Sequence, residues 1–128
     1  MKKTQTIFLS LVVITAITFA VSSCGQKENQ SPVVTIEEPL DNDTISVTDS
    51  LHIEGSLTDD ESLHEASILV IQSTGDTALQ EYPYVHDLKT YDYHYHFHPS
   101  VVGTYTVKVT AEDHEEKSAT TTRTFTVN

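Results

Sequence analysis

GTYTVKVTAED, residues 103–113, is the stretch that decides the fold. Apolar and polar side chains alternate along it, and successive side chains of a β-strand point to opposite faces of a sheet. One face therefore carries Tyr105, Val107, Val109 and Ala111, which we expect in the hydrophobic core. The pattern predicts a β-strand with one buried face.

The same alternation extends over residues 32–128, and no helix of any length fits it. Turn-forming residues such as Ser-Thr-Gly-Asp at 73–76 separate many of the apolar runs. Short strands at this spacing are typical of an all-β sandwich of antiparallel strands. Seven strands are predicted: Val33–Glu37, Ser50–Thr58, Ala66–Ser73, Ala78–Val85, Tyr91–His98, Thr104–Glu112 and Ala119–Val127.

Two residues favour an immunoglobulin-like strand order. Tyr105 opens the sixth predicted strand just after a turn that contains Gly103. A tyrosine corner occupies this position in such folds, with its hydroxyl bonded back to the loop backbone. Pro83 lies inside the fourth predicted strand and cannot donate a ladder hydrogen bond. We therefore expect that strand at an edge, as the fourth strand is in an A-B-E-D sheet.

Three segments carry a resemblance to a known group: PVVTI at 32–36, DDESL at 59–63 and GxYxVxVxAxD at 103–113. They resemble single-domain immunoglobulin-like lipoproteins of Gram-negative bacteria, and also bacterial Ig-like, cadherin-like and polycystic-kidney-disease-type repeats. The resemblance implies the same sandwich for residues 32–128. It implies no particular function, because this fold hosts many unrelated tasks. Residues 114–117 are His-Glu-Glu-Lys where such repeats often have a Gly-Asn turn.

The first 24 residues have the layout of an export signal and its cleavage site: Lys2 and Lys3, an apolar run over 7–20, and VSSC at 21–24. The last four residues resemble a lipobox, which is aliphatic, small, small, Cys. We expect a helical signal peptide over 1–23, cleaved before Cys24, whose thiol receives a diacylglycerol with chains such as palmitate. A retained transmembrane helix is the alternative, but the apolar run falls short of the roughly 20 residues a span needs.

Residues 24–31 are polar and predict a lipidated tether that reaches at most ~25 Å. Cys24 is the only cysteine in the chain, so no intramolecular disulfide can form. We expect a monomer anchored by this lipid at the outer membrane, on its periplasmic or cell-surface face. An envelope protein or polysaccharide is the expected kind of partner.

The mature chain is strongly acidic. Without Lys2 and Lys3 it holds five basic residues against 19 acidic ones, a formal charge of −14. Such a charge repels nucleic acid and anionic lipid headgroups, and excludes nucleic acid as a partner. It can attract divalent cations or a basic partner. Alternatively, it only keeps an exported domain soluble.

The segment YDYHYHFH, residues 91–98, is the most unusual of the chain. If its aromatic side chains face the core, His94, His96 and His98 lie on the outer face. In an immunoglobulin-like order the second predicted strand pairs with this one and turns His52 and Glu54 outward. Such neighbours suit zinc or another late divalent metal, bound by two histidines and either a third histidine or the glutamate. In the alternative, the imidazoles and the acid only pair on a solvated surface.

Two acidic loops form a second candidate site. One contains Asp59, Asp60 and Glu61; the other follows the sixth predicted strand and begins with Asp113. These loops share one end of an immunoglobulin-like sandwich. A calcium ion could bridge their carboxylates with oxygen ligands. Otherwise the carboxylates spread into solvent.

Motifs of catalysis are lacking in the sequence. It has no Gly-x-Ser-x-Gly elbow, no His-Glu-x-x-His pair and no glycine-rich phosphate loop. A lipidated Cys24 could not act as a catalytic thiol. The sequence therefore predicts a non-catalytic binding or interaction module at the cell envelope. The alternative is a divalent-metal-binding lipoprotein that uses the histidine-rich face.

Overall fold

The computed structural model describes residues 30–128. The predicted signal peptide, the predicted lipidation site Cys24 and most of the predicted tether lie outside these residues. Strands are the only regular secondary structure of the described part, which has no helix that is long and apolar enough to cross a membrane. Its eight strands are β1 (Val33–Glu38), β2 (Asp43–Ile45), β3 (Leu51–Thr58), β4 (Leu63–Gln72), β5 (Thr77–Glu81), β6 (Thr90–Phe97), β7 (Gly103–Asp113) and β8 (Ser118–Val127).

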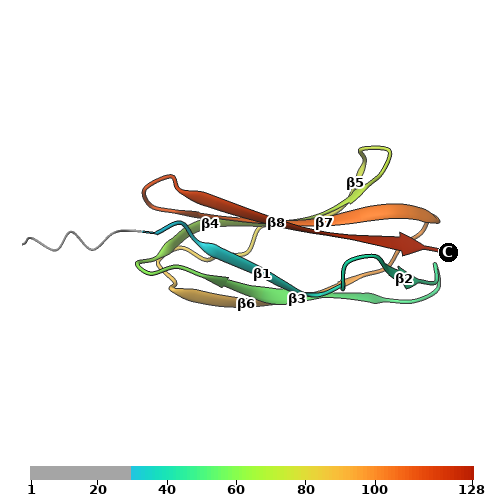
Figure 1. The fold of residues 1–128 in the computed structure, drawn as a ribbon, viewed down its shortest axis with the longest axis horizontal. Helices are drawn as coiled ribbons and strands as arrows, with labels where there is room; N and C mark the ends of the chain where they lie inside the picture. The colour runs from blue at the N-terminus through green and yellow to red at the C-terminus, as the bar shows by residue number, and fades with distance from the viewer. Residues whose placement is uncertain (1–29) are drawn as a thin grey trace, which may run out of the picture.

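The strands form two sheets packed face to face (Figure 1). One sheet has the order β1-β3-β6 and the other β2-β8-β7-β4-β5. All paired strands are antiparallel except β2, which runs parallel to β8. This is an immunoglobulin-like β-sandwich, and it confirms the predicted fold class.

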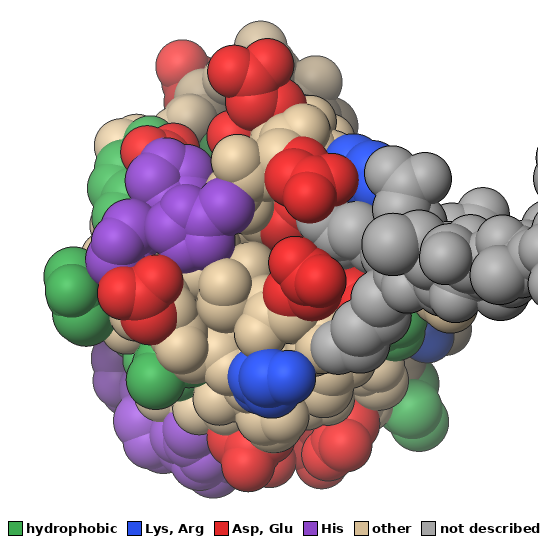
Figure 2. Space-filling model, turned by 90° about the vertical axis from the view of Figure 1, so that its left-hand side faces the viewer, with side chains coloured by type: hydrophobic (Ala, Val, Ile, Leu, Met, Phe, Trp, Pro, Cys, Tyr) green, Lys and Arg blue, Asp and Glu red, His purple; other side chains and the backbone are tan. Residues whose placement is uncertain are grey.

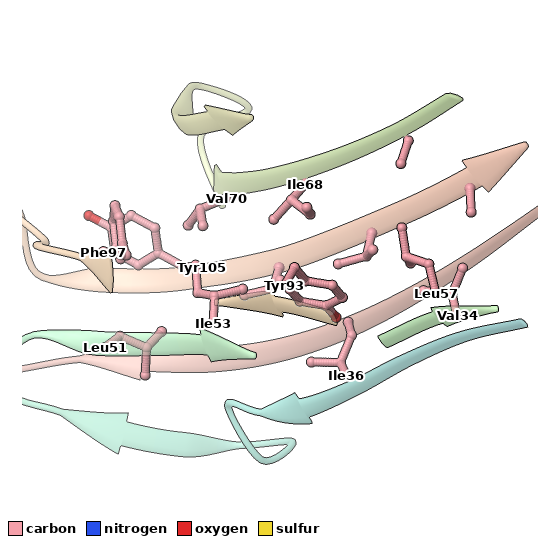
Figure 3. Close-up of a cluster of buried hydrophobic side chains, with 14 of the residues drawn as sticks. Val34, Ile36, Leu51, Ile53, Leu57, Ile68, Val70, Tyr93, Phe97 and Tyr105 are labelled. Atoms are coloured by element: carbon pink, nitrogen blue, oxygen red, sulfur yellow. The ribbon is translucent and has the colours of Figure 1, made fainter. Parts of the chain in front are cut away.

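The core lies between the sheets and is built from the alternate residues of the strands (Figure 3). In β7 the four residues predicted to face inward are all buried. Tyr105 stacks on Phe125 with ring centres 5.4 Å apart, and Phe97 meets Tyr105 edge-on at 5.5 Å. These are geometries that aromatic pairs prefer. The alternation of the sequence thus translates directly into one continuous core.

The predicted tyrosine corner is present. The Tyr105 hydroxyl donates a hydrogen bond of 2.7 Å to the carbonyl oxygen of Val101, four residues earlier. Gln72 Nε2 donates to the same hydroxyl at 3.0 Å. The buried hydroxyl is therefore fully used, and it fixes the loop that leads into β7.

The sheet assignment of the fourth predicted strand is wrong. Its counterpart β5 is an edge strand, as expected, but it pairs with β4 rather than with the sheet of β1, β3 and β6. The tight turn at 73–76 explains this, because Gly75 takes a φ of 96° there and folds β5 straight back onto β4. Pro83 lies beyond the strand, which ends at Glu81.

Two further differences concern strand limits. β2 was not predicted, because three residues are too few to show alternation. β4 begins at Leu63 instead of Ala66, and the register with β7 shifts between Leu63 and Glu65. A bulge inserts an extra residue and interrupts the period of two. The sequence pattern therefore does not reveal the first residues of β4, before Ala66.

Tyr93 connects all three strands of the smaller sheet. From β6 its side chain passes over Gly55 of β3, and its hydroxyl donates a 2.7 Å hydrogen bond to the Thr35 carbonyl oxygen of β1. Burial raises the pKa of Tyr93 well above its usual value of about 10. Burial, with a hydrogen bond that Tyr95 donates to Tyr91, also raises the pKa of Tyr95 to about 12.

These raised pKa values predict a loss of stability at high pH. The unfolded chain releases tyrosine protons near pH 10, whereas the folded domain still holds them, so the free energy of unfolding falls as the pH rises above about 10. Urea unfolding between pH 8 and 11 measures this slope. We expect Tyr93→Phe to reduce it and Tyr84→Phe, at an exposed position, to leave it unchanged. An equal slope in the Tyr93 variant would contradict this explanation.

Candidate metal site

The pairing of β3 with β6 brings together the histidines that were predicted to share one face. His52 lies opposite His96, and Glu54 lies opposite His94. Their strand neighbours Ile53, Tyr93 and Phe97 are buried, so the histidines point outward as predicted.

Glu54 orients two of the imidazoles. Its Oε1 atom lies 2.8 Å from His94 Nδ1 and 3.2 Å from His52 Nδ1. A carboxylate only accepts hydrogen bonds when it is ionised, so these contacts place a hydrogen on Nδ1 of both rings. In a neutral imidazole the other nitrogen, Nε2, then carries the lone pair that a metal requires.

The three rings converge closely enough to share one ion. His94 Nε2 and His96 Nε2 are 3.0 Å apart, and the ring centres of His52, His94 and His96 lie 4.6 to 5.1 Å from one another. Tetrahedral zinc with bonds of about 2.0 Å holds imidazole rings roughly 5 Å apart and their nitrogens about 3.3 Å apart. One ligand atom from each histidine lies within 4.8 Å of the others. Small side-chain adjustments would therefore complete a three-histidine site.

Further acidic residues adjoin this face. Glu38 of β1 lies opposite Glu54, and Glu38, His52 and Glu54 form another group with ligand atoms within 4.8 Å. Sequence alternation missed Glu38 because the register of β1 shifts between Ile36 and Glu38. A shallow hollow beside His94 is also lined by Asp92. The surroundings therefore favour a positive ion.

His98 does not join the site, contrary to the prediction. β6 ends at Phe97, and His98 lies instead against a hollow that Gln72, Ser100 and Tyr105 also line. Pro99 follows it and has no backbone N–H to donate, so the ladder with β3 does not continue past this point. The row of histidines is therefore two residues long on β6 and is completed by His52 of β3.

The acidic loops do not assemble the predicted calcium cage. None of the groups of three potential ligands within residues 30–128 contains Asp59, Asp60, Glu61 or Asp113. Asp59 Oδ1 accepts the backbone N–H of Glu61 at 2.9 Å instead. Asp113 Oδ1 likewise accepts backbone hydrogen bonds in the β7–β8 turn. In this arrangement the two buried aspartates shape their own loops.

Sequence reasoning missed a second histidine group. His64, His86 and His114 come from β4, from the segment 82–89 and from the β7–β8 turn, and their ligand atoms also lie within 4.8 Å of one another. Their separations in the sequence match no ligand motif. The only signal was His114, which stands where the repeats that the sequence resembles often have a Gly-Asn turn.

The fold defines an immunoglobulin-like domain, and the comparisons with known proteins concern this fold. No protein-family model and no curated protein matches the chain. An engineered protein of known structure is similar with a TM-score of 0.55 and 17% identity over 77% of this chain, which spans only 20% of that protein. The PKD1 domain of Vibrio anguillarum Epp has a TM-score of 0.46 and 26% identity, with 79% of this chain and 98% of that one covered. The CARDB domain of the Pyrococcus furiosus PF1109 protein, in complex with di-metal ions, has a TM-score of 0.49 and 12% identity, with 78% and 89% covered.

Proposed function

We propose that this chain is an envelope lipoprotein whose immunoglobulin-like domain binds a divalent transition metal, such as zinc, at His52, His94 and His96. One observation carries the proposal: Glu54 contacts the Nδ1 atoms of His52 and His94, and the Nε2 atom of His94 lies 3.0 Å from His96 Nε2. A carboxylate behind a metal-binding histidine is a recurrent feature of metal sites.

The donor set selects the class of ion. Imidazole nitrogens suit zinc, copper and nickel, whereas calcium and magnesium prefer oxygen ligands. Three histidines leave one position of a tetrahedral ion for water. His94 is half-exposed on an open sheet face, which provides no enclosure that would exclude water from a reaction. The site is therefore suited to holding or delivering an ion rather than to catalysis.

The predicted lipid anchor gives this chemistry a location. A domain held by Cys24 on a short tether acts close to the outer membrane. The excess of acidic residues raises the local concentration of cations around it. The proposal thus combines a membrane anchor, an acidic surface and a histidine site in one small protein.

Zinc titration of residues 25–128, which include the whole described sandwich and its core, tests the proposal. We expect calorimetry to show a dissociation constant well below millimolar, and His94→Ala combined with His96→Ala to weaken this site by about 100-fold or more. His98→Ala is the matched control, because His98 adjoins the site in sequence but lies outside it. Zinc should shift the NMR signals of the His52, His94 and His96 rings. Binding weaker than millimolar, or unchanged in the double variant, would refute the site.

A second candidate function is protein binding through apolar surface near edge strand β5. Tyr82, Tyr84 and Leu88 are exposed by 66%, 81% and 40% in the segment that follows it. Exposed aromatic residues beside an unpaired strand edge suit a protein partner. Elemental analysis of protein purified without chelators or a polyhistidine tag separates the two functions. Bound metal supports metal binding, whereas the absence of metal leaves protein binding as the remaining candidate.

A further inference from the structure

We propose a second transition-metal site, formed by His64, His86 and His114, at the end of the sandwich where the described chain begins. It shares no residue with the site of β3 and β6. Figure 2 looks onto this end and shows the histidine side chains in two separate groups, with acidic side chains around the upper one. Together the two groups contain six of the seven histidines of the chain.

The backbone holds the three donors together. His64 is the second residue of β4, and His114 directly follows β7; their preceding residues Leu63 and Asp113 face each other across the ladder. The segment with His86 is tied to the same strand end, because Leu63 N–H donates to Leu88 and Asp87 N–H donates to Leu63, at 2.7 and 3.0 Å.

Neighbouring side chains fix this segment further. Val85, directly before His86, is 1% exposed and packs into the core. The three imidazoles thus come from backbone positions that the fold already determines, which reduces the ordering that ligand binding requires.

Two of the three imidazoles bring a nitrogen atom into close contact, as two do in the first site. His64 Nδ1 and His86 Nδ1 are 3.1 Å apart, and the three ring centres lie 4.7 to 5.1 Å from one another. Tetrahedral zinc holds imidazole rings at roughly this spacing, about 5 Å. Without a metal, one of two nitrogens at this distance must carry a hydrogen and donate it to the other. A bound ion would instead be coordinated by the lone pairs of both nitrogens.

Carboxylates lie on the outer nitrogens. Asp87 Oδ1 is 3.1 Å from His114 Nε2, and Asp87 Oδ2 is 3.6 Å from His86 Nε2. Glu65 lies 3.9 Å from His64 Nε2. Only the contact with His114 is of hydrogen-bond length, and it favours hydrogen on His114 Nε2 and leaves its Nδ1 for the ion, the reverse tautomer of the site with Glu54. Asp87 is therefore a positioning residue for this site.

The second site is open to a groove, unlike the flat sheet face. His64 and His86 line this groove of about 520 Å³ together with Tyr82, Pro83 and Tyr84. The three histidine side chains are each 38 or 39% exposed. A bound ion would therefore keep a position accessible from the groove for water or a small anionic ligand.

The location is the end from which a membrane tether would extend. The described chain begins there, and Gln30 N–H donates a 3.2 Å hydrogen bond to Asp60 in the β3–β4 loop (Figure 1). If Cys24 carries the lipid, this site lies at the end of the domain that is joined to the lipidated segment. The other site lies on the outer face of the β1-β3-β6 sheet.

Counting zinc equivalents tests the second site independently of the first. We expect residues 25–128 to bind two zinc ions, His114→Ala to bind one, and His94→Ala with His96→Ala to bind the other. His114 lies in an exposed turn, so its removal should leave the unfolding midpoint in urea unchanged. His98→Ala again serves as the control, with two ions bound.

Two further measurements distinguish the outcomes. Asp87→Asn should weaken the second site by about 10-fold, without effect on the first. Cobalt(II) bound to the His94→Ala, His96→Ala variant should show the visible absorption of a tetrahedral site. Two equivalents remaining in His114→Ala, or one equivalent in the wild type that only the His94, His96 variant loses, would overturn the second site and leave the first intact.

Discussion

Replacing Gly55 with alanine is expected to destabilise the domain by about 3 kcal/mol. Gly55 is the central residue of the smaller sheet, where Tyr93 crosses β3 to reach β1. A Cβ atom there would overlap both the Thr35 carbonyl oxygen and the Tyr93 ring and hydroxyl. The sheet cannot admit the methyl group without breaking the Tyr93–Thr35 hydrogen bond, which leaves the Tyr93 hydroxyl without this acceptor.

Urea unfolding of Gly55→Ala, Tyr93→Phe and the double variant checks this mechanism. Both single changes remove the same hydrogen bond, so the loss in the double variant should be smaller than the sum of the single losses. Ser56→Ala, one residue along β3, should change stability by less than about 0.5 kcal/mol. Additive losses would instead mean that the alanine disturbs the sheet independently of Tyr93.

Much of the fold follows from alternation alone. Residues 103–113 alternate because one face of β7 packs against the other sheet, and this constraint is visible in any window of the strand. The pairing of β3 with β6 then follows from the immunoglobulin-like order. It correctly placed His52, Glu54, His94 and His96 on one face. A local pattern and one topological rule were sufficient for most of this face.

The remaining features depend on interactions that no local pattern contains. The sheet that β5 joins is set by the turn before it, and the register of β1 and β4 is changed by irregular pairing. His64, His86 and His114 meet only because a β4–β7 register and the segment 82–89 bring them together. Spacing along the chain therefore could not reveal the second histidine group.

Replacing Asp113 with alanine is the second change from which we expect a large effect, about 3 kcal/mol of lost stability. Asp113 is 1% exposed, and its Oδ1 atom accepts the backbone N–H groups of Glu115 at 2.8 Å and Lys117 at 2.9 Å. These two bonds, each strengthened by the carboxylate charge, hold the β7–β8 turn, in which Glu116 takes a φ of 63°. Alanine would leave both donors without this acceptor.

Asparagine at the same position separates the turn bonds from the buried charge. Asp113→Asn keeps an acceptor oxygen, and its amide replaces Oδ2, which is buried without a hydrogen-bond partner in the described structure. We therefore expect a loss of only about 1 kcal/mol by urea unfolding. Because the same turn carries His114, alanine should also weaken zinc binding at the second site, while asparagine preserves it. Equal losses for alanine and asparagine would show that the charge of Asp113, rather than its acceptor geometry, maintains the turn.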